Sequence, residues 1–164
     1  ALGEKGELDL ASTSLTINEL LQGIPERMKL QLEHKQANFN LNLAEEQMEI
    51  IGDEMHLQNA VCNLIDNALK YNSNKPIINV SSSVVNGYAR IDVTDNGIGM
   101  SSETQKKIFE KFYRVEQGNI HTTKGFGIGL SYVKAIVEGH VGSIQVASKP
   151  NAGTTISLFI PLKK

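Results

Sequence analysis

The residues that could do chemistry are clearest around Asp95, where an apolar strand runs into a glycine turn. In the stretch 91–95, Ile91, Val93 and Asp95 would share one face of a strand. A lone carboxylate on an apolar face is costly unless donors reach it, and the turn 96–99, Asn-Gly-Ile-Gly, lets the backbone approach a ligand closely. Asp95 could therefore bind an amino group, such as the N6 group of adenine. The alternative is a β-turn in which Asp95 binds local amides.

A helix expected over about 54–71 carries an unusual polar stripe. Asn59, Asn63, Asn67 and Lys70 are spaced i, i+4, i+8 and i+11, so at about 100° per residue they fall in a narrow arc. Asparagine is a poor helix former, and solvated helix faces are usually rich in Glu and Lys. The stripe therefore favours a ligand-binding face over a merely solvated one. The apolar face lies on a different stripe: Leu57, Ala60, Val61, Leu64, Ile65 and Ala68.

A second glycine cluster, Gly125-Phe126-Gly127-Ile128-Gly129, opens a further helix that Gly139 and Gly142 end. From 112 to 124 no hydrophobic period survives, which predicts a mobile loop. Together with the asparagine stripe upstream, this cluster favours the interpretation of Asp95 as part of a ligand site over that of a plain β-turn. The apolar positions of the helix are Leu130, Val133, Ile136 and Val137.

Hydrophobic periodicity predicts the elements that must hold these residues. Residues 17–32 have helical spacing, but Gly23 and Pro25 interrupt it, which predicts a kink or a restart. Two helix starts have the spacing of a capping box, Thr16 with Glu19 and Ser102 with Gln105. Strands are expected over Leu8, Leu10 and the Ser/Thr residues that follow, over 37–43, near Ile50 and Ile51, from Ile78 onwards, over 88–93, over 143–148 and over 154–160. Asn86-Gly87 and residues 150–153 would be hairpin turns.

This order of elements predicts an α/β fold, a two-layer sandwich with a mixed, mostly antiparallel sheet and three longer helices on one face. Residues 1–7 are interpreted as a linker remnant and 8–164 as one domain. A net charge of −2 gives no reason to expect nucleic acid or an anionic membrane as partner, and the single Cys62 favours a reducing, cytoplasmic compartment. The chain looks like a fragment of a longer one. A membrane anchor, if the parent chain has one, is expected outside this fragment, in the inner membrane.

Four motifs in this order resemble the ATP-binding domain of sensor histidine kinases, in the superfamily of gyrase, heat-shock chaperone and mismatch-repair ATPases. The resemblance extends from about residue 8 to Leu162, and the four motifs together are far more specific than either glycine box alone. They are an asparagine box at 63–71, a first glycine box at 95–99, a phenylalanine box at 109–114 and a second glycine box at 125–130.

The resemblance implies a binding site for ATP and Mg²⁺. Asp95 would accept from adenine N6 with help from Thr154, and Tyr71 would lie near the ribose or base. Asn67 would hold Mg²⁺ through its side-chain oxygen, and a cation that keeps several waters suits one neutral ligand. Asn63 would contact a phosphate or the waters of the metal, and Lys70 would pair with phosphate charge. The other nucleotide-binding positions implied are Gly97 and Gly99 in the first glycine box, and Gly125, Gly127, Gly129 and Leu130 in the second.

Residues 100–124 would form the ATP lid, with Arg114 placed to neutralise charge on the transferred phosphoryl group. The second glycine box often has Thr or Ser where this chain has Phe126, and Lys124 would supply charge nearby instead. Arg114, Lys70 and Asn63 are the expected catalytic residues.

The resemblance leaves several function classes: a histidine kinase domain, an ATPase, a serine kinase of the anti-sigma type, and a nucleotide-binding module without chemistry. The ATPases of the superfamily carry a Glu one helical turn before the metal-binding Asn, and here that place is Asn63, which cannot act as a general base. This favours the kinase. None of the four histidines, His34, His56, His121 and His140, has the context of a phosphoacceptor. The acceptor is expected on a separate dimerisation domain of the parent chain, and a response regulator is the expected downstream partner.

Overall fold

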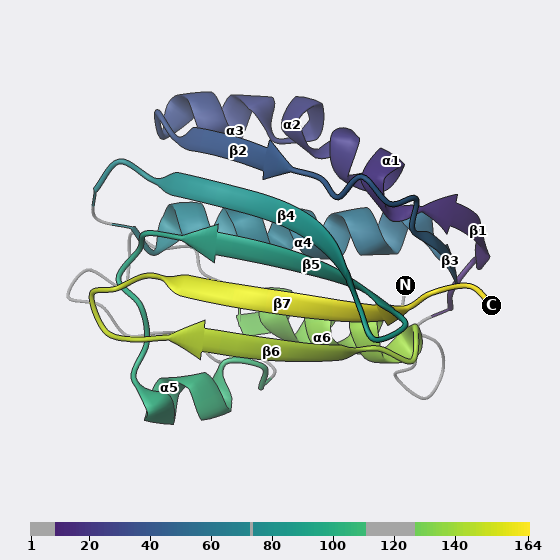
Figure 1. Ribbon diagram of the computed structural model, residues 1–164. Helices are drawn as coiled ribbons and strands as arrows, with labels where there is room; N and C mark the ends of the chain where they lie inside the picture. The colour runs from purple at the N-terminus through teal and green to yellow at the C-terminus, as the bar shows by residue number, and fades with distance from the viewer. Residues whose placement is uncertain (1–8, 73, 111–126) are drawn as a thin grey trace.

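The computed structural model describes residues 9–72, 74–110 and 127–164, and a five-stranded sheet is its centre (Figure 1). The strand order is β2-β4-β5-β7-β6. Neighbouring strands are antiparallel except β2 and β4, which are parallel. The expected mixed, mostly antiparallel sheet is therefore confirmed. Its strands are β2 (Asn38–Asn42), β4 (Ile77–Val85), β5 (Tyr88–Asp95), β6 (Ser143–Ser148) and β7 (Thr154–Pro161).

The hairpin between β4 and β5 forms where the Asn-Gly signal predicts it. Asn86 and Gly87 both have positive φ, 47° and 82°, the conformation of a two-residue turn that matches the twist of the strands. The register pairs Ile78 with Asp95, and β5 in turn pairs Asp95 with Thr154 at the start of β7. This register places Asp95 at one end of the sheet, beside the turn that follows it.

The first strand forms only in the Ser/Thr part of the stretch that predicts it. It is β1 (Thr13–Thr16), which does not include Leu10, and it pairs with β3 (Glu49–Gly52) in a separate two-stranded sheet. The capping box at Thr16 is also absent. Thr16 precedes the next helix, but its side chain makes no cap hydrogen bond, and its Oγ1 atom is buried without a partner. The backbone of Thr16 belongs to the β1–β3 ladder, opposite Glu49, so the strand rather than a capping box sets its position.

The expected first long helix is three short ones. They are α1 (Ile17–Gln22), α2 (Ile24–Arg27) and α3 (Lys29–His34). Gly23 separates α1 from α2, and Pro25 stands in the first turn of α2, where a missing N–H costs nothing. These helices lie along the β2 edge of the sheet (Figure 1).

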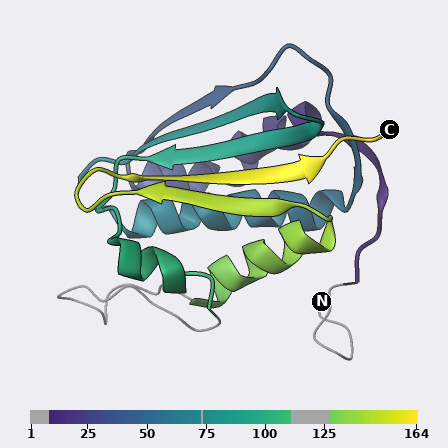
Figure 2. The same cartoon turned by 60° about the horizontal axis from the view of Figure 1, so that its bottom comes forward.

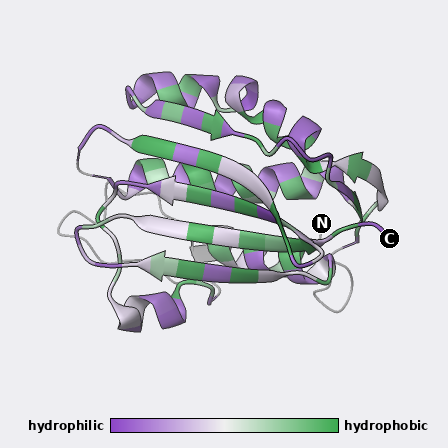
Figure 3. Cartoon of the chain, in the orientation of Figure 1, coloured by the Kyte–Doolittle hydropathy of each residue, from purple (hydrophilic) through white to green (hydrophobic). Residues whose placement is uncertain are grey.

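The two long helices are α4 (Glu54–Lys70) and α6 (Gly127–Gly139), and both cover the same face of the sheet (Figure 2). Along the strands, hydrophobic and hydrophilic residues alternate, so one side of the sheet packs against these helices (Figure 3). Burial of this face against α4 and α6 forms the core. Its members include Leu57, Ala60, Val61, Ile65, Val80, Ile91, Val93, Val133, Ile136, Val137 and Leu158.

A short helix, α5 (Ser102–Lys107), follows the glycine turn. Its N-cap is Ser101 rather than the predicted Ser102, and the Ser101 hydroxyl accepts from the Thr104 amide at 3.2 Å. Gln105 does not complete a capping box, because its Nε2 donates to the carbonyls of Met100 and Ser148, at 3.0 and 2.8 Å. None of the helices within the described ranges has both the length and the apolar character that a membrane crossing needs.

Candidate nucleotide-binding site

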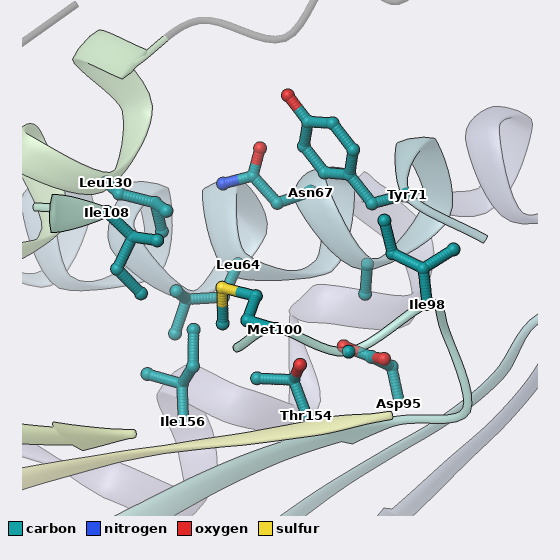
Figure 4. A pocket seen from close by; sticks show the side chains of 12 residues that line it. Leu64, Asn67, Tyr71, Asp95, Ile98, Met100, Ile108, Leu130, Thr154 and Ile156 are labelled. Carbon is teal, nitrogen blue, oxygen red and sulfur yellow. The ribbon is translucent and has the colours of Figure 1, made fainter. Parts of the chain in front are cut away.

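The site is a pocket at one end of the sheet, between α4 and the strands β5 and β7 (Figure 4). The pocket is open to solvent, and its empty space is about 520 Å³ when the open mouth is counted. Its walls are mostly apolar, with Asp95, Asn67, Tyr71 and Thr154 as the polar side chains. The other lining residues are Leu64, Ala68, Ile98, Gly99, Met100, Ile108, Leu130 and Ile156.

Asp95 is half-buried on the face that its parity predicts, next to Ile91 and Val93, which are 1% and 3% exposed. Burial raises the pKa of the Asp95 carboxyl, and hydrogen bonds from the Gly97 and Thr154 backbones offset part of that rise. The Gly97 amide donates to Oδ1 at 2.7 Å. The carboxylate therefore binds a local amide, as the turn alternative predicts, and it also lines the pocket. Binding of an amino group by Asp95 stays a prediction.

The glycines of the first box are required by close backbone approach. A Cβ atom on Gly97 would lie 2.6 Å from the Tyr71 carbonyl oxygen. On Gly99, which has a φ of 68°, it would lie 1.8 Å from the Lys149 carbonyl oxygen. The turn is thus pressed between the end of α4 and the β6–β7 connection. This packing positions the backbone of Gly99 as part of the pocket wall.

Gly99→Ala is expected to destabilise the protein by more than ~2 kcal/mol, because it adds a clash with backbone to a left-handed φ that itself costs about 1–2 kcal/mol. Thermal denaturation checks this. Gly87→Ala is the matched control, since Gly87 also has a positive φ, 82°, but nothing lies within 4 Å of the added Cβ. The control should show only the conformational cost. Equal loss of stability in both variants would contradict a backbone clash at Gly99.

Asn67 and Tyr71 come from the last turns of α4 and line the pocket opposite the sheet (Figure 4). Lys70 lies between them in sequence, and its ammonium pairs with Asp66 at 2.8 Å, both side chains being partly exposed. The structure therefore brings Asn67, Tyr71, Asp95, Gly99, Leu130 and Thr154 together around one pocket.

Only part of the asparagine stripe faces the pocket. Asn67 lines the pocket, Asn63 is half-buried one turn earlier and does not line it, and Asn59 is used elsewhere. The Asn59 amide nitrogen lies 3.4 Å from the Tyr132 hydroxyl, and its oxygen accepts from Arg27. Asn59 therefore links α4 to α2 and α6, which explains one asparagine of the stripe without a ligand.

The second glycine box reaches the site through α6. The structure describes this helix from Gly127 onwards, and the predicted start at Gly125 lies outside the described residues. A Cβ atom on Gly129 would lie 3.9 Å from Nδ2 of Asn67, so the first turn of α6 faces the metal-binding candidate. Arg114, Lys124 and Gly125 lie outside the described residues, as does most of the expected lid.

Of the apolar walls of the pocket, sequence reasoning found only Leu130, and it missed two polar residues behind the pocket. Ile98 and Met100 could have been found, because Ile98 lies in the first glycine box and Met100 directly follows it. Ser148 and Gln105 carry no local signal. Ser148 accepts from the Met100 amide at 2.8 Å, and the Gln105 contacts tie the same segment to β6. Only the fold brings these residues to the base of the pocket.

Two of the four histidines have a structural role. His56 Nδ1 lies 2.7 Å from the Tyr132 hydroxyl, and His140 Nε2 accepts from the Asp53 amide at 2.9 Å. Both imidazoles are buried. His34 is exposed in the last turn of α3, and His121 lies outside the described residues. Within those residues, no group of three or more His, Cys, Asp or Glu side chains is arranged to hold a metal ion.

Comparison with known proteins gives one family. The family model described as histidine kinase-, DNA gyrase B-, and HSP90-like ATPase matches residues 52–164. The sensor protein RprX of Bacteroides fragilis (strain YCH46) is 39% identical over 163 residues, 98% of this chain and 31% of RprX. The chain thus spans about a third of the length of this relative.

Solved structures of histidine kinases have the same fold as this chain. The mycobacterial sensor histidine kinase MprB gives a TM-score of 0.78 at 26% identity, over 93% of this chain and 99% of that one. The histidine kinase ThkA, solved in complex with the response regulator protein TrrA, gives 0.77 at 21% identity, over 94% of this chain and 42% of that one, and at this identity it shows the fold alone. The chain therefore belongs to the histidine kinase-, DNA gyrase B-, and HSP90-like ATPase family, and the relatives named above are sensor proteins and histidine kinases.

Proposed function

We propose that this domain binds Mg-ATP and donates the γ-phosphoryl group to a histidine on a separate dimerisation domain of a two-component sensor kinase. The observation that supports this most directly is the polarity of the pocket. Its sheet end holds the Asp95 carboxylate, which suits an exocyclic amino group. Its other side holds Asn67 beside the first turn of α6, and the free amides of a helix N-terminus suit phosphates.

In this proposal Asn67 would hold Mg²⁺ through its side-chain oxygen. A magnesium ion usually keeps several waters and takes other ligands from the substrate phosphates, so one neutral protein ligand fits it. Lys70, now paired with Asp66, would turn its charge to a phosphate when nucleotide binds. Gly127 and Gly129 would contribute backbone contacts in the first turn of α6. Lys124, Gly125 and Arg114, from the lid and second glycine box, remain proposed contacts of the phosphates.

Asn67→Ala is expected to remove the dependence of ATP binding on Mg²⁺, because it removes the only proposed metal ligand. The helix should persist, since alanine is a good helix former. Calorimetric titration with ATP, with and without Mg²⁺, measures this. Asn59→Ala is the matched control, since it makes the same change on the same helix at a residue that binds Arg27 and Tyr132. A variant at position 67 whose affinity Mg²⁺ still improves would place the ligand elsewhere.

A kinase is favoured over a hydrolase by Asn63. It stands one helical turn before Asn67, where an ATPase of this superfamily would need a general base, and an amide cannot take a proton from water. Asn63 is instead proposed to contact a phosphate or a water of the metal. Appearance of label on a histidine of a dimerisation domain supplied in trans tests the proposal, and steady release of phosphate by this domain alone would favour an ATPase.

The proposed partners follow from this reaction. They are ATP, the dimerisation and phosphoacceptor domain of the same parent chain, and a response regulator, which ThkA is seen to bind in its complex with TrrA. The net charge of −2 supports neither a nucleic-acid partner nor contact of this domain with an anionic membrane. The proposed location of the domain is the cytoplasm, with any membrane anchor in the remainder of the parent chain.

A further inference from the structure

Ser148, the last residue of β6, lies behind the pocket and makes three hydrogen bonds with one hydroxyl. Its Oγ atom accepts from the Met100 amide at 2.8 Å, donates to the Gly153 carbonyl at 2.9 Å, and lies 2.8 Å from the Thr154 hydroxyl. Met100 and Thr154 both line the pocket, whereas Ser148 does not. Ser148 therefore contacts two walls of the nucleotide site from outside it.

The direction of the bond between the two hydroxyls follows from counting hydrogens. A serine hydroxyl has one hydrogen and two lone pairs. The Gly153 carbonyl can only accept, so it takes the single hydrogen of Ser148. The Met100 amide can only donate, so it occupies one lone pair. The remaining lone pair of Ser148 must then accept from Thr154, which directs the Thr154 hydroxyl hydrogen away from the pocket.

We propose that Ser148 is a specificity-determining residue of the nucleotide pocket, because it makes Thr154 present only acceptor lone pairs to the bound base. Thr154 is the register partner of Asp95 across β5 and β7. The two side chains lie together at the sheet end of the pocket (Figure 4). With the Thr154 hydrogen engaged by Ser148, this end offers acceptors from both residues.

Two acceptors side by side select a base whose edge carries hydrogen. The amino group of adenine can donate to them, whereas hypoxanthine carries a carbonyl oxygen at the same position and brings acceptor against acceptor. A buried polar group left without a partner weakens binding more than a missing contact does. The inference rests on the proposed function, in that the ligand is taken to be a purine nucleotide bound with its base at Asp95.

The experiment measures the affinities of ATP and inosine triphosphate by calorimetry in wild type and in Ser148→Ala. Without Ser148 the Thr154 hydroxyl can rotate and donate to the carbonyl of hypoxanthine. The ratio of the two dissociation constants is therefore expected to fall by about fivefold, the effect of one net hydrogen bond. Ser148→Ala also removes the contacts with Met100 and Gly153. Their loss should weaken the binding of both nucleotides by the same factor, so it does not contribute to the change in the ratio.

Three further variants separate orientation of Thr154 from a structural role. Ser148→Thr keeps a hydroxyl on the strand and should restore the ratio. Ser143→Ala makes the same change at the other end of β6, where the side chain is exposed, and should leave the ratio at its wild-type value. In Thr154→Val the hydroxyl is gone, so adding Ser148→Ala should lower the ratio no further.

Two outcomes contradict different claims. If Ser148→Ala weakened the binding of ATP and of inosine triphosphate by the same factor, Ser148 would only support the fold. This result would overturn the role given to Ser148, but the proposed function of ATP binding would stand. Failure of the wild type to bind either nucleotide would overturn the proposed function itself. Wild-type binding without preference for ATP would likewise contradict the role given to Thr154.

Discussion

Asp95→Asn is expected to weaken ATP binding at least about tenfold while leaving the folded protein no less stable than wild type. The carboxylate offers two acceptor oxygens, one of which receives the Gly97 amide at 2.7 Å. An asparagine keeps one acceptor but places an amino group against the amino group of adenine, so a hydrogen bond is replaced by a repulsive contact. A difference of this kind is worth about 1.4 kcal/mol or more, which is tenfold in affinity.

Although Asp95→Asn should weaken ATP binding, it should not lower the stability of the folded protein, because burial raises the pKa of Asp95 from its ordinary value of 3.8. A carboxyl with a raised pKa in the folded state binds its proton more tightly there than in the unfolded chain. Above that pKa the ionised group therefore costs stability, and the cost disappears as the pH falls through it. At neutral pH the neutral asparagine avoids this cost, so its melting temperature should be equal to or higher than that of wild type.

Calorimetry with ATP, together with thermal denaturation between pH 4 and 7, measures both effects. Asp92→Asn is the matched control, since Asp92 is on the same strand but on the opposite face, paired with Arg90 at 3.0 Å. The control should bind ATP as wild type does. Unchanged ATP affinity in Asp95→Asn would remove Asp95 from the adenine site, and an unfolded variant would show that the carboxylate serves the turn rather than the ligand.

The sequence predicts those parts of the site that depend on local rules. Side chains alternate along a strand whatever its neighbours are, so the parity of Asp95 with Ile91 and Val93 places it on the inner face before the sheet is known. The Asn86-Gly87 hairpin and the restart of the helix at Gly23 and Pro25 are local in the same way. These predictions are confirmed because few competing contacts act on them.

Other features depend on contacts between distant residues, and sequence reasoning missed them or placed them wrongly. Thr16 has the residue type of a helix cap, but pairing of β1 with β3 competes for its backbone and prevails. Asn59 has the spacing of the ligand stripe, but Arg27 and Tyr132 occupy its amide. Ser148 contacts the pocket-lining residues Met100 and Thr154 only because β6 ends beside the first glycine box, and no spacing in the chain indicates that.

The domain by itself is expected neither to hydrolyse ATP appreciably nor to label itself with phosphate. Phosphoryl transfer depends on positioning and on neutralising charge in the transition state, so a missing acceptor abolishes the reaction rather than slowing it modestly. His56 and His140 are buried and bound to Tyr132 and Asp53, and neither can serve as the acceptor. Position 63 offers an amide where a hydrolase would need a base.

A dimerisation domain of the parent chain, supplied in trans, should restore labelling on its own histidine. Radiolabelled Mg-ATP is mixed with the domain alone and then with this partner, and acid treatment reveals the acid-labile phosphohistidine.

Arg114→Ala should slow transfer much more than it weakens nucleotide binding, because its charge is needed mainly as the phosphoryl group leaves. Lys107→Ala is a suitable control, since Lys107 pairs with Glu103 on α5 and does not line the pocket. Steady phosphate release by the domain alone, abolished by Asn63→Ala, would reverse the assignment and make this domain an ATPase.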